Sequence, residues 1–179
     1  MKVINFSKSV LNKSYLTISV LGKNLKLNIK YTKSSNNIEL IKKELEIDLL
    51  LPIKYKNFNN MEIINSAIMK LYSKLAYTEI EDSLELARHI LKFAPEDYKI
   101  EKLDGVFYKC KRNKVLVISP DIMQFNKDII NTTILQAFCK IKHKINSKQY
   151  KETLENALNQ YEKYKKQLKI SKQQQLKIG

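Results

Sequence analysis

The spacing of apolar residues changes along this chain, and the change limits the folds that it can adopt. Over residues 16–51 apolar side chains alternate with polar ones, and turn residues at 22–24 and 34–37 interrupt the alternation. The alternating apolar residues are Leu16, Ile18, Val20, Leu25, Leu27, Ile29, Leu45, Ile47, Leu49 and Leu51. A period of two places apolar groups on one face of a strand. The pattern therefore predicts a small antiparallel sheet that ends near Pro52, with a lysine-rich face in solvent.

Beyond residue 60 the apolar spacing becomes three and four, which is typical of amphipathic helices. One helix is predicted over residues 63–75. Thr78 and Glu81 then have the spacing of a capping box, in which each side chain satisfies a free backbone N–H at the start of a helix. A second helix is predicted from this point up to Pro95, because proline cannot continue a helix.

Three short β-prone runs at 98–103, 106–110 and 115–118 predict a second small sheet. Helical spacing returns at Lys127, where Asn126 is placed to cap the helix, and a last helix follows. The predicted fold class is α+β. Its elements are an N-terminal antiparallel sheet, two central helices, a second small sheet and a C-terminal helix pair.

The length of 179 residues corresponds to one domain with a core of its own. No internal repeat and no linker rich in Pro, Gly or Ser divides the chain. The domain is predicted at residues 1–168, with a strand-rich start at 1–52 and a helical part at 60–168. Residues 169–179 are rich in lysine and glutamine and are predicted to form a solvated tail.

The net charge of +15 predicts a basic surface that favours anionic partners. Only Arg88 and Arg112 are arginines, so the positive charge comes almost entirely from lysine. Arginine is the residue suited to bidentate contacts with phosphate and guanine. The lysine bias therefore weakens a nucleic-acid interpretation of the charge.

Membrane and secretory classes are not expected. No apolar run reaches the roughly 18 residues that a membrane span requires, and residues 1–8 reach Asn5 and Ser7 too early for a signal core. The two cysteines, Cys110 and Cys139, are too few for a disulfide framework. We therefore expect a cytoplasmic location. With three glycines in all, the chain also has no glycine-rich phosphate loop and no serine nucleophile elbow.

Several short segments in residues 103–168 occur in a distinctive order. Phe107-Tyr108-Lys109-Cys110 is followed by the predicted strand at 115–118, a turn at Ser119-Pro120 and then Gln136-Ala137-Phe138-Cys139-Lys140-Ile141. Asn146-Ser147, Tyr150 and a tyrosine- and lysine-rich segment at 161–166 come next.

This order resembles the YgjP-like metallopeptidases, relatives of the SprT-like zinc proteases. Where the chain has the tetrapeptide ending in Cys110, the family has Trp-Gly-Ser-Cys. At 136–141 the family has His-Glu-Leu-Cys-His-Leu, and near 146 it has Asn-His-Ser. The resemblance implies that the helix carrying Gln136 and Lys140 packs against the short sheet around Cys110.

The departures from the family motif bear on activity. A zinc peptidase needs two imidazoles one helical turn apart, a third ligand, and a carboxylate as general base. The resemblance puts Gln136 and Lys140 at the two histidine positions, Ala137 at the base and Asn146 at the third histidine. A protonated lysine has no lone pair for a metal. The resemblance therefore implies an inactive homologue, a pseudoenzyme, with no metal and no other cofactor.

A displaced metal site is an alternative. Cys139 and His143 are four residues apart and so share a helix face, and the implied fold brings Cys110 near them. The opposing interpretation is that the two cysteines are packed core residues and that His143 is solvent-facing or hydrogen-bonded. The sequence leaves both open.

Two kinds of partner follow from these features. A pseudoenzyme that keeps a peptide-binding groove beside the altered helix would be a protein-binding or regulatory module. A basic nucleic-acid-binding module is the alternative, because tyrosines interleaved with lysines, as at 161–166, can stack bases and follow a phosphate backbone. The same tyrosines could instead cover the buried edge of a helix.

Overall fold

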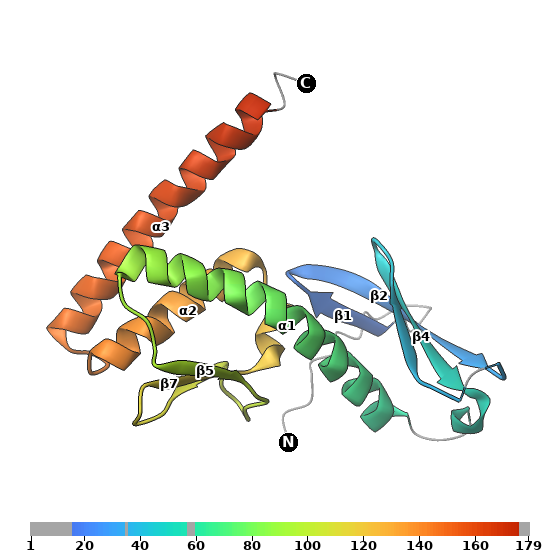
Figure 1. Ribbon diagram of the computed structural model, residues 1–179. Helices are drawn as coiled ribbons and strands as arrows, with labels where there is room; N and C mark the ends of the chain where they lie inside the picture. The colour runs from blue at the N-terminus through green and yellow to red at the C-terminus, as the bar shows by residue number, and fades with distance from the viewer. Residues whose placement is uncertain (1–15, 35, 57–59, 176–179) are drawn as a thin grey trace.

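The structure is a computed structural model that describes residues 16–34, 36–56 and 60–175, with the backbone alone at 169–175. The predicted α+β class is confirmed: two small sheets and three helices make up the fold (Figure 1). The segment at 1–8, which is predicted not to form a signal core, lies outside the described residues. None of the described helices is long and apolar enough to cross a membrane.

The first sheet has the strand order β1-β2-β4-β3. Its strands are β1 (Leu16–Val20), β2 (Lys23–Thr32), β3 (Glu39–Lys42) and β4 (Glu46–Pro52). The prediction of an entirely antiparallel sheet is wrong, because β2 and β4 run parallel. The reason is the tight β3–β4 hairpin, which leaves β3 at the edge and brings β4 back alongside β2.

The inner face of this sheet packs on the helix α1 (Met61–Leu91) and forms much of the core. The buried strand residues are Ile18, Val20, Leu25, Leu27, Ile47, Leu49 and Leu51. They come from the alternating positions, so the predicted apolar face is confirmed except at Leu45, which lies in the β3–β4 turn and is 73% exposed. Tyr72 of α1 also donates a hydrogen bond to the carbonyl oxygen of Ser19, at 2.5 Å, and so ties the helix to β1.

Helix α1 is one continuous element of 31 residues, and the prediction of two central helices is wrong. No glycine or proline interrupts residues 61–91, and the buried side chains of Ala76 and Ile80 carry the apolar stripe across the predicted break. The helix ends at Leu91, and Lys92 takes the left-handed conformation at its C-cap. Figure 1 shows α1 running from the first sheet to the C-terminal helices.

The second sheet is confirmed and has the order β5-β7-β6. Its strands are β5 (Asp97–Ile100), β6 (Tyr108–Cys110) and β7 (Val115–Ile118). A short 3-10 segment, η2 (Pro120–Gln124), then leads to α2 (Lys127–Lys142). The backbone N–H of Leu21, in the β1–β2 turn, donates to the carbonyl of Met123 at 2.7 Å. This bond connects the first sheet to the start of α2.

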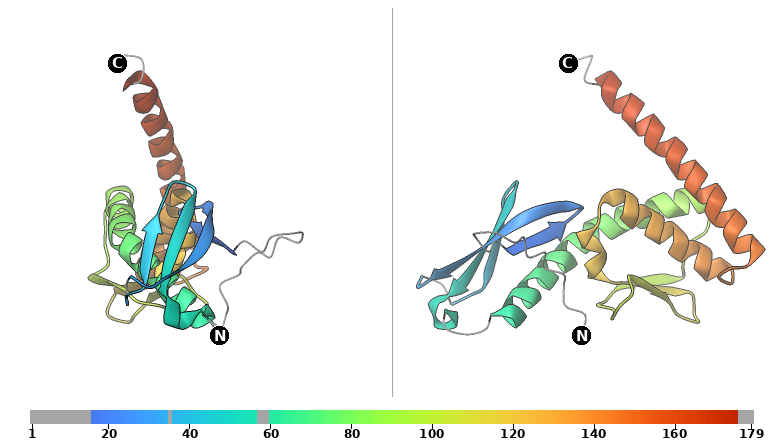
Figure 2. Two further views of the ribbon diagram at one scale, coloured as in Figure 1. Left: turned by 90° about the vertical axis from the view of Figure 1, so that its right-hand side faces the viewer. Right: turned by 180° about the vertical axis from the view of Figure 1, so that it is seen from behind.

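The C-terminal helix pair consists of α2 and α3 (Lys148–Gln175). Asn126 caps α2 as predicted, since its side chain accepts a hydrogen bond from the backbone N–H of Ile129 at 3.0 Å. The buried Tyr161 of α3 bonds to Asn131 and Asp128 of α2, at 2.9 and 2.7 Å. Beyond this contact α3 projects from the body of the molecule (Figure 2). The helix continues to Gln175, so residues 169–175 of the predicted tail have helical backbone.

Candidate functional site

Helix α2 packs against β6, as the resemblance implied. The thiol of Cys110 on β6 lies 3.6 Å from the carbonyl oxygen of Ala137 on α2. Gln136 is exposed on α2, and Lys140 is half-buried one turn further along. These two side chains and the outer part of β6 form one surface, which we call the α2–β6 surface.

An aromatic ring on β6 engages Lys140. The ammonium of Lys140 lies 5.4 Å from the centre of the Tyr108 ring, within the range of a cation–π interaction. Burial raises the pKa of Tyr108 to about 12, with smaller contributions from Tyr150 and the nearby thiols. The hydroxyl of Tyr108 is therefore neutral near pH 7. The α2–β6 surface thus presents a cation beside neutral polar groups.

The side chain of Ala137 points into the protein. It has 0% exposure and belongs to the same core cluster as Phe138 and Ile134. Gln136 is exposed beside it. A methyl group packed in the core supplies neither a proton acceptor nor a metal ligand.

Asn146 lies in the turn between α2 and α3. Its φ of 65° is in the left-handed region, which asparagine tolerates better than most residues. The side chains of Gln136 and Asn146 form no hydrogen bond to another side chain within the described ranges. The left-handed φ therefore gives Asn146 a conformational role in this turn.

The two cysteines and His143 occupy three different environments. Cys139 is fully buried, and burial raises the pKa of its thiol to about 11. Burial also raises the pKa of Cys110, although the charge of Lys140 acts in the opposite direction. His143 caps the C-terminus of α2, and its Nε2 lies 3.1 Å from the hydroxyl of Thr153 on α3. Raised thiol pKa values disfavour the thiolate form that binds metals.

Metal-ligating side chains do not gather in the described part of the chain: no group of three or more His, Cys, Asp or Glu residues there could hold a metal ion. A displaced site built on Cys110, Cys139 and His143 stays a prediction.

The comparisons with known proteins give one match. A family model described as a YgjP-like metallopeptidase domain matches residues 4–171. The chain belongs to the YgjP-like family. No curated protein and no solved structure matches it. The match covers both sheets, helices α1 and α2 and most of α3 in this YgjP-like protein, so the resemblance seen in residues 103–168 extends over almost the whole chain.

The residues of this YgjP-like protein do not fit the zinc ion that the family name implies. Zinc in proteins is held by imidazole, thiolate and carboxylate groups. The predicted site positions instead carry an exposed amide at Gln136, an ammonium at Lys140, a buried methyl group at Ala137 and an exposed amide at Asn146. No reaction step through a metal follows from these four side chains.

Cys139 is expected to resist alkylation in the folded protein. The thiolate is the reactive form, and with a pKa of about 11 the thiol is almost entirely protonated at about pH 8. Iodoacetamide should modify Cys139 more than about tenfold more slowly in the folded protein than in urea, and the rate should rise with pH. Mass spectrometry of digests measures this, with the half-buried Cys110 as an internal comparison. Equal rates in the folded and unfolded protein would contradict the burial of Cys139.

Two features of the structure were not predicted from the sequence. The Lys140–Tyr108 contact depends on how β6 is placed against α2, which no local pattern encodes. A groove between β3 and α1, described below, was also missed. Its signal in the sequence is the pair Lys70 and Lys74, one helical turn apart and interleaved with Leu71 and Leu75.

Proposed function

We propose that this protein is a non-catalytic member of the YgjP-like family that acts as a protein-binding or regulatory module. The observation that carries the proposal is the packing of Ala137, at the position where the family motif has its glutamate base. Its side chain is part of the core and has no contact with solvent. A general base must reach the water that it deprotonates.

The charge of the α2–β6 surface supports the same conclusion. Lys140 stands at the second histidine position of the motif and places an ammonium there. An ammonium repels a divalent cation instead of donating a lone pair to it. Gln136 supplies at best a neutral carbonyl oxygen, which is a poor ligand for zinc. A surface without catalytic groups can still bind a partner, and binding is the role that we propose for the domain.

A hydrolysis assay tests the proposal. The purified protein is incubated with fluorescent casein, with added zinc and, separately, with a chelator. We expect equal background signals in both conditions, because a zinc peptidase loses its activity when the metal is removed. Hydrolysis that needs zinc and stops with the chelator would overturn the proposal.

Nucleic-acid binding is the second candidate function, and the projecting part of α3 favours it. From residue 163 to its end at Gln175 this helix carries five lysines and no acidic residue. Lys163 and Lys166 are exposed, whereas Lys165 pairs with Glu162 at 2.7 Å and with Asp128 at 3.4 Å. A projecting basic helix can follow a phosphate backbone.

Salt dependence measures this second function. If α3 binds duplex DNA, the affinity should fall at least about tenfold between about 50 and 200 mM salt. The double variant Lys163→Glu/Lys166→Glu should lose most of the binding. The matched control, Lys70→Glu/Lys74→Glu on α1, changes the net charge equally and should bind more tightly than the α3 variant. Absence of binding by the unmodified protein at low salt would remove this candidate.

A further inference from the structure

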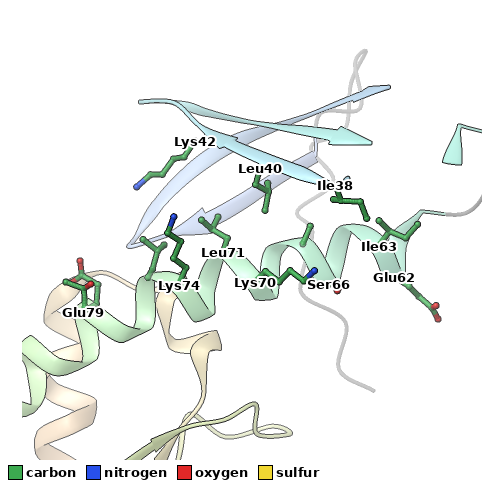
Figure 3. A pocket seen from close by; sticks show the side chains of 13 residues that line it. Ile38, Leu40, Lys42, Glu62, Ile63, Ser66, Lys70, Leu71, Lys74 and Glu79 are labelled. Carbon is green, nitrogen blue, oxygen red and sulfur yellow. The ribbon is translucent and has the colours of Figure 1, made fainter. Parts of the chain in front are cut away.

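A groove of about 890 Å³ runs between β3 and α1, in the N-terminal half of the protein. Leu40 of β3 and the preceding Ile38 point from the strand towards the helix, and Leu71 points from the helix towards the strand (Figure 3). Ile38 is 41% exposed although it is apolar. The groove therefore has an apolar floor that is open to solvent.

Lysines surround this apolar floor. Lys42 comes from β3, and Lys70 and Lys74 come from α1. All three are exposed, and none of them forms an ion pair with another described residue. Figure 3 shows Lys42 and Lys74 at the same end of the groove, on opposite walls. Three unpaired cations around an apolar floor favour a ligand that is both apolar and acidic.

The acidic residues of the groove do not neutralise these lysines. Glu79 forms an ion pair with Lys127 of α2, at 2.7 Å, and Glu62 points away from the strand wall (Figure 3). The positive charge around the floor is thus available to a ligand.

The strand wall of the groove is also a sheet edge. β3 ends the strand order β1-β2-β4-β3, so no described strand pairs with its outer side. The β3–β4 hairpin is held by Lys43, whose ammonium lies 2.8 Å from Asp48 and whose backbone N–H donates to Glu46 at 2.9 Å. An edge strand fixed in this way can accept a further strand through its backbone groups.

We propose that the groove binds an extended acidic and apolar segment of a partner protein, which adds as a strand beside β3 on the side that no described strand occupies. The proposal rests on the protein-binding role proposed above and gives that role a place and a partner chemistry. Backbone hydrogen bonds to β3 provide affinity, and side chains on alternate positions provide specificity. Apolar side chains enter the groove beside Leu40 and Leu71, and acidic ones meet Lys70 and Lys74 at its rim.

Fluorescence anisotropy with synthetic peptides tests this inference on the full chain. The probe is a labelled octapeptide of alternating valine and glutamate. One control peptide carries lysine in place of glutamate, and the other has methylated backbone nitrogens along one edge, which prevent strand pairing. The variant Lys70→Glu/Lys74→Glu should weaken binding of the probe at least about tenfold. The control variant Lys163→Glu/Lys166→Glu, with the same change of net charge, should bind the probe like the unmodified protein.

Three results would overturn the inference. They are no binding of the probe, equal weakening by both double variants, and equal binding of the methylated peptide. If the methylated peptide does bind and palmitate displaces it, the groove is a site for an acyl chain instead. Mass spectrometry of the probe after incubation with zinc separates this inference from the proposed function. Cleavage of the probe would overturn the non-catalytic role, but binding of the probe to the groove could still be measured. An intact probe that does not bind would overturn the peptide-binding proposal alone.

Discussion

Replacing Ala137 with glutamate is expected to lower the free energy of unfolding by about 3 kcal/mol or more. Under the proposed correspondence with the family motif, this single change introduces glutamate at the position of the general base. Because Ala137 has 0% exposure, the new carboxylate must either be buried in the core or force α2 away from β6. Urea denaturation followed by circular dichroism measures the change.

The matched control for this variant is Gln136→Glu. It adds the same charge one residue earlier, on the exposed side of α2 and one turn before Lys140. The free energy of unfolding should change by no more than about 0.5 kcal/mol, because substitutions at exposed positions rarely have larger effects. A glutamate one turn before Lys140 also forms a favourable pair with it. If both variants unfolded at the same urea concentration, the side chain at position 137 would be accessible to solvent, and its proposed burial would be wrong.

Replacing Gly22 with alanine is expected to destabilise the protein by about 2 to 4 kcal/mol. Gly22 lies in the β1–β2 turn with a φ of 77°, which residues other than glycine rarely adopt. An added Cβ would lie 2.6 Å from the Cβ of Asn126, the residue that caps α2. The substitution therefore combines backbone strain with a clash at the contact that joins the first sheet to α2.

Gly105 provides the control, because its φ of 75° is nearly the same and an added Cβ would meet nothing within 4 Å. Gly105→Ala should cost only about 1 kcal/mol, from the backbone conformation alone. The difference between the two thermal midpoints isolates the clash with Asn126. Equal losses in both variants would mean that the β1–β2 turn does not press on the start of α2.

The sequence predicted which side of each strand is buried better than it predicted which strands lie side by side. Alternation in β2 and β4 identified the buried residues Leu25, Leu27 and Leu49. It did not reveal that β2 and β4 run parallel. A period of two determines which side of a strand is buried, but the partner and direction of a strand depend on hairpins and on packing elsewhere.

Local signals at a helix end were also less decisive than burial. Thr78 and Glu81 have the spacing of a capping box, yet they lie within α1. The carboxylate of the intervening Glu79 pairs with Lys127, and the buried Ala76 and Ile80 keep the helix continuous. Tertiary contacts with the core and with α2 favour one long helix here, and a cap pattern read from the sequence cannot include them.

For the candidate site, the sequence provided the residues and the fold provided their environment. The motif comparison predicted a former site at Gln136, Ala137, Lys140 and Asn146, but it did not predict that Ala137 is buried or that Lys140 lies against Tyr108. The groove between β3 and α1 was missed, because the spacing of Lys70 and Lys74 indicates a basic helix face but not the strand that lies opposite it.

The zinc content of the purified protein shows whether this domain keeps a metal site. The protein is prepared without chelator or metal affinity resin, dialysed against zinc and analysed by elemental mass spectrometry beside the double variant Cys139→Ser/His143→Ala. If the domain holds no metal, both proteins contain less than about a tenth of an equivalent of zinc. About one equivalent in the unmodified protein, lost in the variant, would contradict the absence of a metal and establish a displaced site at Cys139 and His143.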